Sequence, residues 1–384
     1  MVATIVAAVV GTLIMGLYAN RPFAIAPYMG ENAFIAFTVV KTMGFSWQTA
    51  LAAVFISGVL FVALTVARIR QWLLESVPPG LRYSFAAGIG LFLVFIGMNE
   101  AGIVALGVPG APVRIGVLTS PTVLMAIGCF LLISVLMMWQ VPGAILLGIL
   151  SAAAASFILG LAPAPARWTG APPDLRPLLF QIDLRGALSW PFLGVLLTIF
   201  MMAFIDTLGS LIGLSARAGF LDADGRLPQI ERPMLADAIA TTVAGLIGTT
   251  TSGAFIESAT GIAAGGRTGF TAVVTAALFA AALFFAPLIT GIPPAAYSPA
   301  LIVVGLQMLA PIARIDFDDY TEMIPAFAVV VLMSFTYNIG IGITGGFVLC
   351  PFFKLVTGRA REVSPGLWVL SAFSLLFFIF YPYR

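Results

Sequence analysis

The sequence predicts an all-α protein that crosses a lipid bilayer many times, and three observations support this. Only 9% of the residues are charged and 61% are hydrophobic, whereas a soluble domain carries about a quarter charged residues. The mean hydropathy is +1.10. The apolar residues also fall in blocks of roughly 17 to 25 positions, the length that a helix needs to cross about 30 Å of hydrocarbon. The bilayer is therefore the expected environment of this chain.

The apolar segments give the expected order of elements. About fourteen of them follow one another, at residues 2–19, 23–42, 47–67, 83–104, 121–139, 142–161, 190–213, 233–249, 251–265, 268–290, 296–312, 322–338, 339–357 and 365–382. The first begins directly after Met1 without a basic leader or a cleavage site, so it is not a signal peptide. We therefore expect a multi-pass protein.

Two segments cannot be continuous helices. Residues 21–33 contain two prolines and a glycine, and residues 248–259 are rich in threonine and glycine. Proline removes a backbone donor, and glycine and threonine weaken helix interiors. Each segment predicts an extended piece that leads into a short helix. Because irregular backbone at membrane depth is tolerated only where protein buries it or where it lines a polar cavity, we expect one site between the two.

A weak internal repeat relates the same two segments. Glu31-Asn-Ala33 corresponds to Glu257-Ser-Ala259, and Ser76-Val-Pro-Pro79 corresponds to Gly291-Ile-Pro-Pro294. Two matches in the same order predict two halves of about seven segments each, as in transporters built from inverted repeats. The segment at 190–213 has no counterpart before residue 2. We therefore expect that one N-terminal helix is absent from this chain, through a late start assignment or by genuine loss.

Charge placement predicts the orientation and excludes some partners. Basic residues flank three loops that an up-and-down count places on one face, which should be cytoplasmic: Arg68, Arg70 and Arg82; Arg217, Arg226 and Arg232; Lys354, Arg359 and Arg361. They form no basic stripe, so nucleic-acid binding is not predicted. The chain has no histidine, and its two cysteines lie in apolar segments, so neither a metal nor a cofactor is predicted.

Three carboxylates at membrane depth are the candidate functional groups, because a charge at the bilayer centre costs at least about 2.5 kcal/mol on insertion scales. Asp206 and Glu257 are expected to be functional, whereas Glu31 also fits a capping role at a short helix. Asp237 is interpreted as a structural acid in the first turn of its helix. Asn338 is interpreted as a packing hinge.

This inventory predicts the chemistry of a ligand. Carboxylates accept hydrogen bonds and the amides of broken segments donate them, which suits flat heteroaromatic molecules with N–H and C=O edges. Phe23, Tyr28, Phe34 and Phe255 are candidates for ring stacking. A buried carboxylate that takes a proton outside and releases it inside would couple uptake to the proton gradient.

Several stretches resemble the adenine/guanine/hypoxanthine permeases of the nucleobase–cation symporter 2 superfamily. They are residues 18–34, 206–213, 336–340 and 256–269, the last with the pattern Glu-Ser-Ala-x-Gly-x-Ala-Ala-Gly-Gly-Arg-Thr-Gly. The resemblance covers essentially the whole chain. It implies a polytopic seven-plus-seven inverted-repeat transporter fold with short strands in the two broken segments, in a bacterial-type cytoplasmic membrane.

The resemblance also implies domains, a site and partners. Residues 1–67 and 190–291 would form a core domain, residues 68–161 and 292–384 a gate domain with a C-terminal helix, and residues 162–189 an extramembrane loop. Proton-linked purine uptake would use Asp206 and Glu257 for both substrate and proton. The superfamily suggests a homodimer. The remaining expected substrate contacts are Phe23, Ala24, Glu31, Asn32, Thr251, Ser252 and Phe255. Two departures are the absent first helix and Glu31, which stands at a position that is apolar in many members.

Alternatives are another nucleobase such as uracil or xanthine, an anion carrier of the same fold, or an inactive N-terminally truncated copy. An anion carrier should have a cationic site, whereas acids dominate here. A membrane aspartyl protease would need a contiguous Asp-Thr-Gly, which Leu208 interrupts after Asp206 and Thr207. An enzyme is therefore not predicted.

Overall fold

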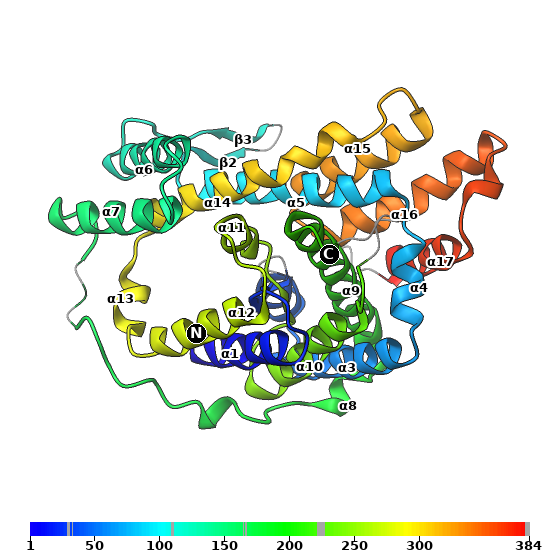
Figure 1. Ribbon diagram of the computed structural model, residues 1–384, viewed down its shortest axis with the longest axis horizontal. Helices are drawn as coiled ribbons and strands as arrows, with labels where there is room; N and C mark the ends of the chain where they lie inside the picture. Colours follow the sequence, from blue (N-terminus) through cyan, green and yellow to red (C-terminus); the bar gives the residue numbers. More distant parts are fainter. Residues whose placement is uncertain are drawn as a thin grey trace.

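The computed structural model describes residues 1–28, 31–32, 34–108, 111–163, 165, 167–220 and 227–380, and helices dominate it (Figure 1). The first half contains α1 (Val2–Leu17), β1 (Ile25–Pro27), the π-helix η1 (Phe34–Thr42), α3 (Trp47–Val66), α4 (Ile69–Glu75), α5 (Pro79–Glu100), β2 (Val104–Val108), β3 (Ala111–Ile115), α6 (Pro121–Met138) and α7 (Ala144–Ile158). These elements fall on the predicted apolar segments, except for α4 and the β2–β3 hairpin, which were not predicted.

The second half of the chain begins with a largely irregular linker. It contains η2 (Arg176–Leu178), α8 (Leu184–Ala187), η3 (Trp190–Phe192), α9 (Leu193–Ala218), α10 (Glu231–Ile247), β4 (Ser252–Ala254), α11 (Ser258–Ala263), α12 (Gly269–Ala282), α13 (Ala286–Gly291), α14 (Pro294–Leu309), η4 (Ala310–Arg314), α15 (Tyr320–Phe335), α16 (Ile339–Val356), η5 (Ala360–Glu362) and α17 (Pro365–Phe380). The predicted segment 268–290 is divided into α12 and α13.

Five stretches in the described chain are long and apolar enough to cross a bilayer by length and composition. They are Trp47–Val66, Pro79–Glu100, Pro121–Met138, Trp190–Leu211 and Pro294–Arg314. Six further apolar helices of 10–17 residues accompany them. The chain is a multi-pass membrane protein, as its composition predicts.

The two broken segments meet as an antiparallel strand pair. Strand β1 pairs with β4 in the register Ile25–Ala254, Ala26–Gly253 and Pro27–Ser252. In the alignment that matches Glu31 with Glu257, Ala26 corresponds to Ser252 and Pro27 to Gly253. In the strand pair, Ala26 is paired with Gly253 and Pro27 with Ser252, so each residue pairs with the counterpart of its neighbour. Helical residues follow each strand, at 31–32 and in α11. The predicted strand-to-helix breaks are confirmed.

The helices pack in two groups. Helix α3 packs on α10 and α12 packs on α1, while α5 packs on α14 and α15 on α16. Helices α1 and α10 contact the strand pair and pack with α12 and α3, and the second four form a neighbouring group with α6 and α7 (Figure 1). Both groups contain helices from each half of the chain, as an inverted repeat requires.

The α5–α14 contact shows the repeat most directly. Aligning Pro79 with Pro294 also aligns Gly90 with Gly305, and these two glycines touch each other. A Cβ on Gly90 would lie 2.7 Å from the Gly305 carbonyl oxygen, and a Cβ on Gly305 would meet the Gly90 carbonyl oxygen. Small residues let membrane helices approach this closely.

Replacing Gly90 by alanine should therefore destabilise the protein. The methyl group must push α5 from α14, and overpacking of this kind costs about 1 to 3 kcal/mol. Gly128→Ala in α6 is the matched control, because nothing lies within 4 Å of a Cβ there. We expect a lower melting temperature in detergent for Gly90→Ala alone; equal melting temperatures for both variants would contradict the close contact.

Helices α3 and α10 run antiparallel, and their contact shows which of their ends lie at the same face of the molecule. A Cβ on Gly58 would lie 2.6 Å from Thr242 Cα, and one on Gly245 would lie 2.7 Å from the Phe55 amide nitrogen. The end of α3, which precedes Arg68, therefore lies at the same face as the start of α10.

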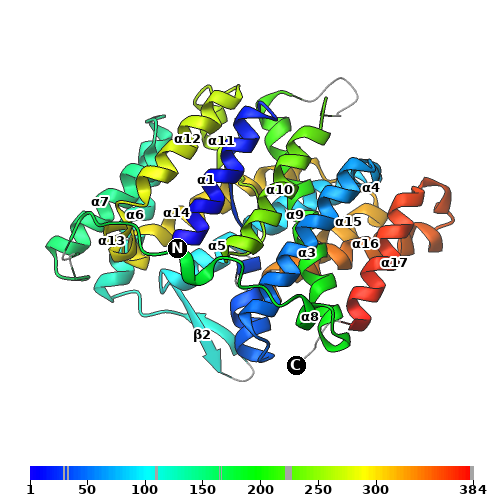
Figure 2. The same ribbon diagram turned by 90° about the horizontal axis from the view of Figure 1, so that it is seen from below.

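A second contact adds the remaining basic loop to this face. The Ser364 hydroxyl donates to the Ser76 carbonyl at 2.9 Å, which joins the loop after α16 to the loop between α4 and α5. The three basic loops thus share one face, as predicted (Figure 2). Arg226 lies outside the described residues.

The linker between the halves follows the opposite face. The Phe180 amide donates to the Leu246 carbonyl at 2.8 Å, at the end of α10. The Asp183 carboxylate caps α8 and accepts from the Thr49 hydroxyl at 3.2 Å, at the start of α3. These contacts tie the second half of the linker to the ends of α3 and α10.

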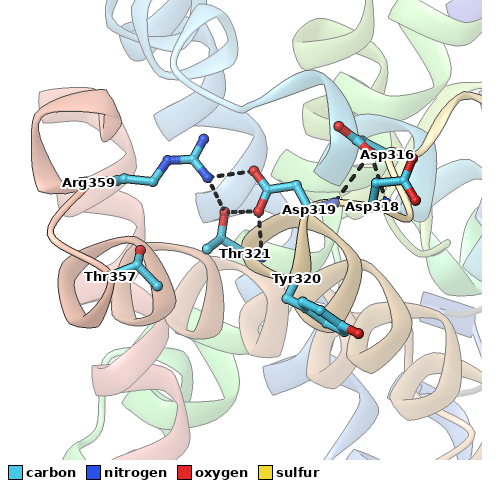
Figure 3. A pocket seen from close by; sticks show the side chains of 7 residues that line it. All are labelled: Asp316, Asp318, Asp319, Tyr320, Thr321, Thr357 and Arg359. Carbon is cyan, nitrogen blue, oxygen red and sulfur yellow. Dashed lines mark hydrogen bonds and ion pairs between the residues drawn. The ribbon is translucent and has the colours of Figure 1, made fainter.

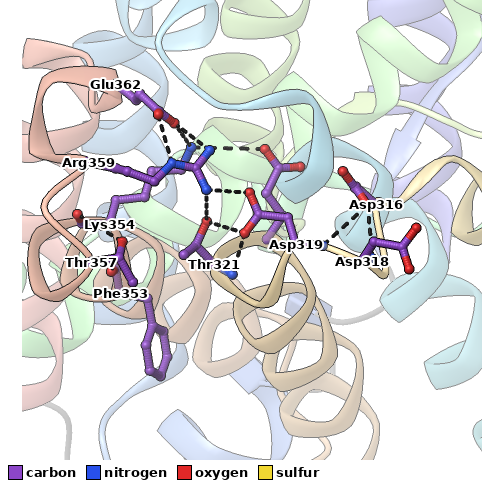
Figure 4. Close-up of polar contacts among 10 residues, drawn as sticks. Asp316, Asp318, Asp319, Thr321, Phe353, Lys354, Thr357, Arg359 and Glu362 are labelled. Atoms are coloured by element: carbon purple, nitrogen blue, oxygen red, sulfur yellow. Dashed lines mark hydrogen bonds and ion pairs between the residues drawn. The ribbon is translucent and has the colours of Figure 1, made fainter.

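An ion-pair network joins α15, α16 and η5 on the basic face (Figure 4). Arg359 pairs with Asp319 at 2.6 Å and with Glu362 at 2.7 Å. Lys354, whose side chain is only 7% exposed, pairs with Glu362 at 2.9 Å. Asp319 and Arg359 also line an open depression with Asp316, Asp318, Tyr320, Thr321 and Thr357 (Figure 3).

This network predicts a pH dependence. Hydrogen bonds from Arg359 lower the pKa of Asp319 and of Glu362 to about 2. Because the native pKa values lie below the unfolded ones, the stabilisation is complete above the unfolded values and is lost as the pH falls toward 2. Arg359→Gln should lower the melting temperature slightly at neutral pH and not at the acid limit. Arg361→Gln, at a site with no ion pair to described residues, should have no effect; a pH-independent Arg359 effect would contradict the assignment.

Candidate functional site

Asp206 lies in the middle of α9, a mostly apolar helix, and its side chain is buried. Its Oδ1 atom is inaccessible to solvent and has no hydrogen-bond partner among the described residues. Buried polar atoms in native proteins nearly always have a partner, so an orphaned carboxylate oxygen indicates a place for a ligand or a proton.

A chain of hydroxyl groups connects this part of α9 to the first broken segment. The Tyr28 hydroxyl donates to the Thr207 hydroxyl at 3.3 Å and lies 3.3 Å from the Ser210 hydroxyl. The Thr207 hydroxyl donates to Asp237 Oδ2 at 2.8 Å. Residues from both halves of the repeat are therefore linked beside Asp206.

Asp237 is a buried carboxylate that the sequence analysis placed in the first turn of its helix. Helix α10 begins at Glu231, so Asp237 lies in the second turn and not the first, and its side chain is fully buried. The interpretation as an acid that answers the helix dipole was wrong, because the dipole effect falls off within the first turn. An acid in an apolar stretch, well inside its helix, was the available signal.

Strand β4 lies directly against this network. A Cβ on Gly253 would meet the Tyr28 hydroxyl and lie 2.5 Å from Asp237 Oδ1. The position therefore requires glycine. The Thr241 hydroxyl donates to the Ser252 carbonyl at 2.6 Å, which holds β4 against α10.

Glu31 is the third buried carboxylate. It is 1% exposed, and neither of its carboxylate oxygens has a hydrogen-bond partner in the described part of the chain. It interacts electrostatically with Asp206 and Asp237, and the described charges that act on it are all acidic. The structure thus brings Glu31, Asp206 and Asp237 together.

Glu257 lies in the turn between β4 and α11 and is partly exposed. The short helix that follows it packs against α9, the helix of Asp206. Thr251, just before β4, is fully buried, and its hydroxyl oxygen has no partner among the described residues. Phe255, in the same turn as Glu257, is also partly exposed.

The remaining predicted residues tie the two broken segments together. The Ala24 amide donates to the Ser258 hydroxyl at 2.9 Å, and the Phe255 amide donates to the Ala24 carbonyl at 2.8 Å. The Asn32 side chain accepts from the Thr250 hydroxyl. Phe23 is fully buried and packs against Phe220, with 6.3 Å between the ring centroids. Of the residues in the repeat pattern, Ala33 lies outside the described residues.

We expect the buried Glu31 carboxylate to lower the stability of the folded protein. A buried ionised group without a partner costs about 1 to 3 kcal/mol or more, and Gln removes the charge while keeping the shape. Glu31→Gln should raise the melting temperature, because neither carboxylate oxygen has a partner among the described residues. Glu231→Gln, at the exposed start of α10, is the control. A lower melting temperature for Glu31→Gln would show that the carboxylate supports the fold.

Comparison with known proteins places this geometry in a family. The model of the permease family matches residues 1–356. The chain is 40% identical to the guanine/hypoxanthine permease PbuG of Bacillus subtilis, over 98% of the chain and 86% of that protein. It is 37% identical to the adenine permease AdeQ of Escherichia coli, over 97% of the chain and 83% of that protein.

Two solved structures have a similar fold. One is the transmembrane domain of the cyanobacterial bicarbonate transporter BicA, with a TM-score of 0.59 and 20% identity over 88% of this chain and 92% of that one. The other is the murine anion transporter Slc26a9 in the inward-facing state, with a TM-score of 0.57 and 10% identity over 99% of this chain and 66% of that one. At these identities the likeness shows the fold alone. The fold, the matched residues and the identities together establish that this chain belongs to the permease family and is a membrane transporter, not an enzyme.

Proposed function

We propose that this permease takes up purine nucleobases, namely hypoxanthine, guanine or adenine, together with protons across the cytoplasmic membrane. The observation that carries the proposal is the cluster of buried carboxylates beside the antiparallel strand pair β1–β4. Relatives that align over nearly the whole chain are named guanine/hypoxanthine and adenine permeases, which supports the substrate class.

The chemistry of the cluster and of the neighbouring second broken segment suits a nucleobase. Asp206 and Glu257 accept hydrogen bonds from ring N–H groups, and the Thr251 and Ser252 segment offers hydroxyl and backbone groups. Phe255 lies beside Glu257 and offers a ring face for stacking. The first broken segment provides the other proposed contacts, namely Phe23, Ala24, Glu31 and Asn32.

The interaction among three buried carboxylates supports proton coupling. Glu31, Asp206 and Asp237 interact in a buried site, and like charges in such a site repel one another, so a proton shared among them lowers the electrostatic cost. We assign the coupled proton to Asp206, which belongs to this cluster, or to Glu257, which lies in the turn before α11. A nucleobase that displaces or shares this proton would link the two fluxes.

The helix groups support a core and a gate. The group around the strand pair, from residues 1–67 and 190–291, would carry the substrate. The group from residues 68–161 and 292–384 would form the wall against which it moves. Alternating access of this kind needs the site to lie between repeats, as the β1–β4 pairing suggests.

Uptake of radiolabelled hypoxanthine tests the proposal. Competition by guanine, adenine, xanthine, uracil and sulfate should show that purines compete and sulfate does not. A protonophore should abolish accumulation. Inhibition by sulfate would favour an anion carrier, against which the acidic surroundings of Glu31 argue.

A further inference from the structure

The hairpin β2–β3 has one face that is entirely apolar, although it lies outside the transmembrane helices. Its strands pair Val104 with Ile115 and Leu106 with Val113. Side chains alternate between the faces of a strand, so these four residues share one face. Leu106 is 79% exposed and Ile115 is 72% exposed.

The other face has a different character. Ala105 pairs with Arg114, and the Arg114 side chain is exposed. A two-stranded hairpin is marginally stable in water unless one face packs on something. The apolar face therefore needs a partner that the described chain does not provide.

The base of the hairpin is held rigidly at the end of α5. The Gly116 amide donates to the Ile103 carbonyl at 2.8 Å, and a Cβ on Gly116 would meet the Gly102 carbonyl oxygen. Strand β2 also packs on α5. Helix α5 ends at Glu100, so the hairpin begins within four residues of a membrane-spanning helix, on the face opposite the basic loops (Figure 2).

The apolar surface continues into α6, a helix whose apolar side chains are largely exposed. After β3, Val117 is 70% exposed, and α6 follows at Pro121. Only 22% of the residues Pro121–Met138 of α6 are buried, and Leu124 and Leu131 are each 56% exposed. Figure 1 shows the hairpin beside α6 at the outer edge of the molecule.

We propose that the β2–β3 hairpin lies in the interface of the membrane leaflet opposite the basic face, with Leu106, Val113 and Ile115 among the lipid chains. Arg114, on the other face, points to the headgroups and water. Apolar residues on one side and a basic residue on the other are the pattern of elements that lie in this interface. The hairpin thereby anchors the α5–α6 connection to the lipid.

Fluorescence quenching of a labelled hairpin tests this placement. Leu106→Cys and Arg114→Cys are made in a background with Cys129→Ala and Cys350→Ala, and each is labelled with a polarity-sensitive dye. The protein is reconstituted in phosphatidylethanolamine and phosphatidylglycerol vesicles. We expect the label at 106 to be quenched several-fold more by doxyl lipids than by iodide, and the label at 114 to show the reverse. Ile115→Cys repeats the test on the same face if Leu106→Cys lowers the melting temperature.

Two outcomes would overturn the proposal. Equal quenching of both labels by iodide would place the hairpin in water. Protection of the 106 label from both quenchers, lost when the protein is diluted into excess lipid, would show that a second copy of the chain covers it. Neither outcome depends on which substrate the permease carries.

Discussion

Replacing Asp206 by asparagine should reduce nucleobase uptake to background while the protein still folds. Asparagine keeps the shape and one acceptor oxygen but cannot be ionised or carry the proton. A hydrogen bond to a charged group contributes about 1.5 to 3 kcal/mol, so substrate binding should weaken about 10- to 100-fold. Loss of the protonatable group should stop proton-driven accumulation as well.

Paired measurements separate these effects. Binding of hypoxanthine to the purified variant reports the hydrogen bond, and uptake into proteoliposomes under a proton gradient reports coupling. Asp318→Asn changes an exposed acid of the loop before α15 and should leave both unchanged. Normal accumulation by Asp206→Asn would remove this residue from the mechanism.

Replacing Glu257 by glutamine should raise the KM for hypoxanthine about 10- to 100-fold, for the same physical reason. Glu257 is partly exposed in the turn before α11, so the exchange should change the melting temperature little. Glu257→Asp keeps the charge on a shorter side chain and should retain more activity than glutamine. Uptake kinetics over a range of hypoxanthine concentrations measure both variants.

The control for Glu257 is Glu231→Gln, an exposed acid at the start of α10. It should show wild-type KM and maximal rate. If Glu257→Gln and Glu257→Ala both transport normally under a proton gradient, the second broken segment does not bind the substrate.

Much of the fold could be predicted because the bilayer makes the sequence pattern strong. Every predicted apolar segment contains a helix, or a strand followed by helical residues, and the repeat found through Glu31 and Glu257 reappears in the β1–β4 register. Prolines and glycines marked both breaks because they cannot continue a helix. The hairpin β2–β3 was missed because its ten strand residues are too short to form an apolar block.

The site could be predicted only in part. Asp206 and Glu31 were visible because a charge in an apolar run is costly, and the structure brings them together. The link from Tyr28 through Thr207 to Asp237 was not visible, because it joins residues that are 30 and 179 positions apart. Hydroxyl groups in membrane helices usually bond within their own helix, so their sequence gives no signal of a longer contact.

The internal pH of proteoliposomes tests the central claim, proton-coupled nucleobase uptake, most directly. Vesicles loaded with a pH-sensitive dye, and with the membrane potential clamped by valinomycin and potassium, are mixed with external hypoxanthine. We expect acidification of the interior that follows radiolabelled uptake and is absent for Asp206→Asn. Uptake of hypoxanthine without any change in internal pH would contradict it.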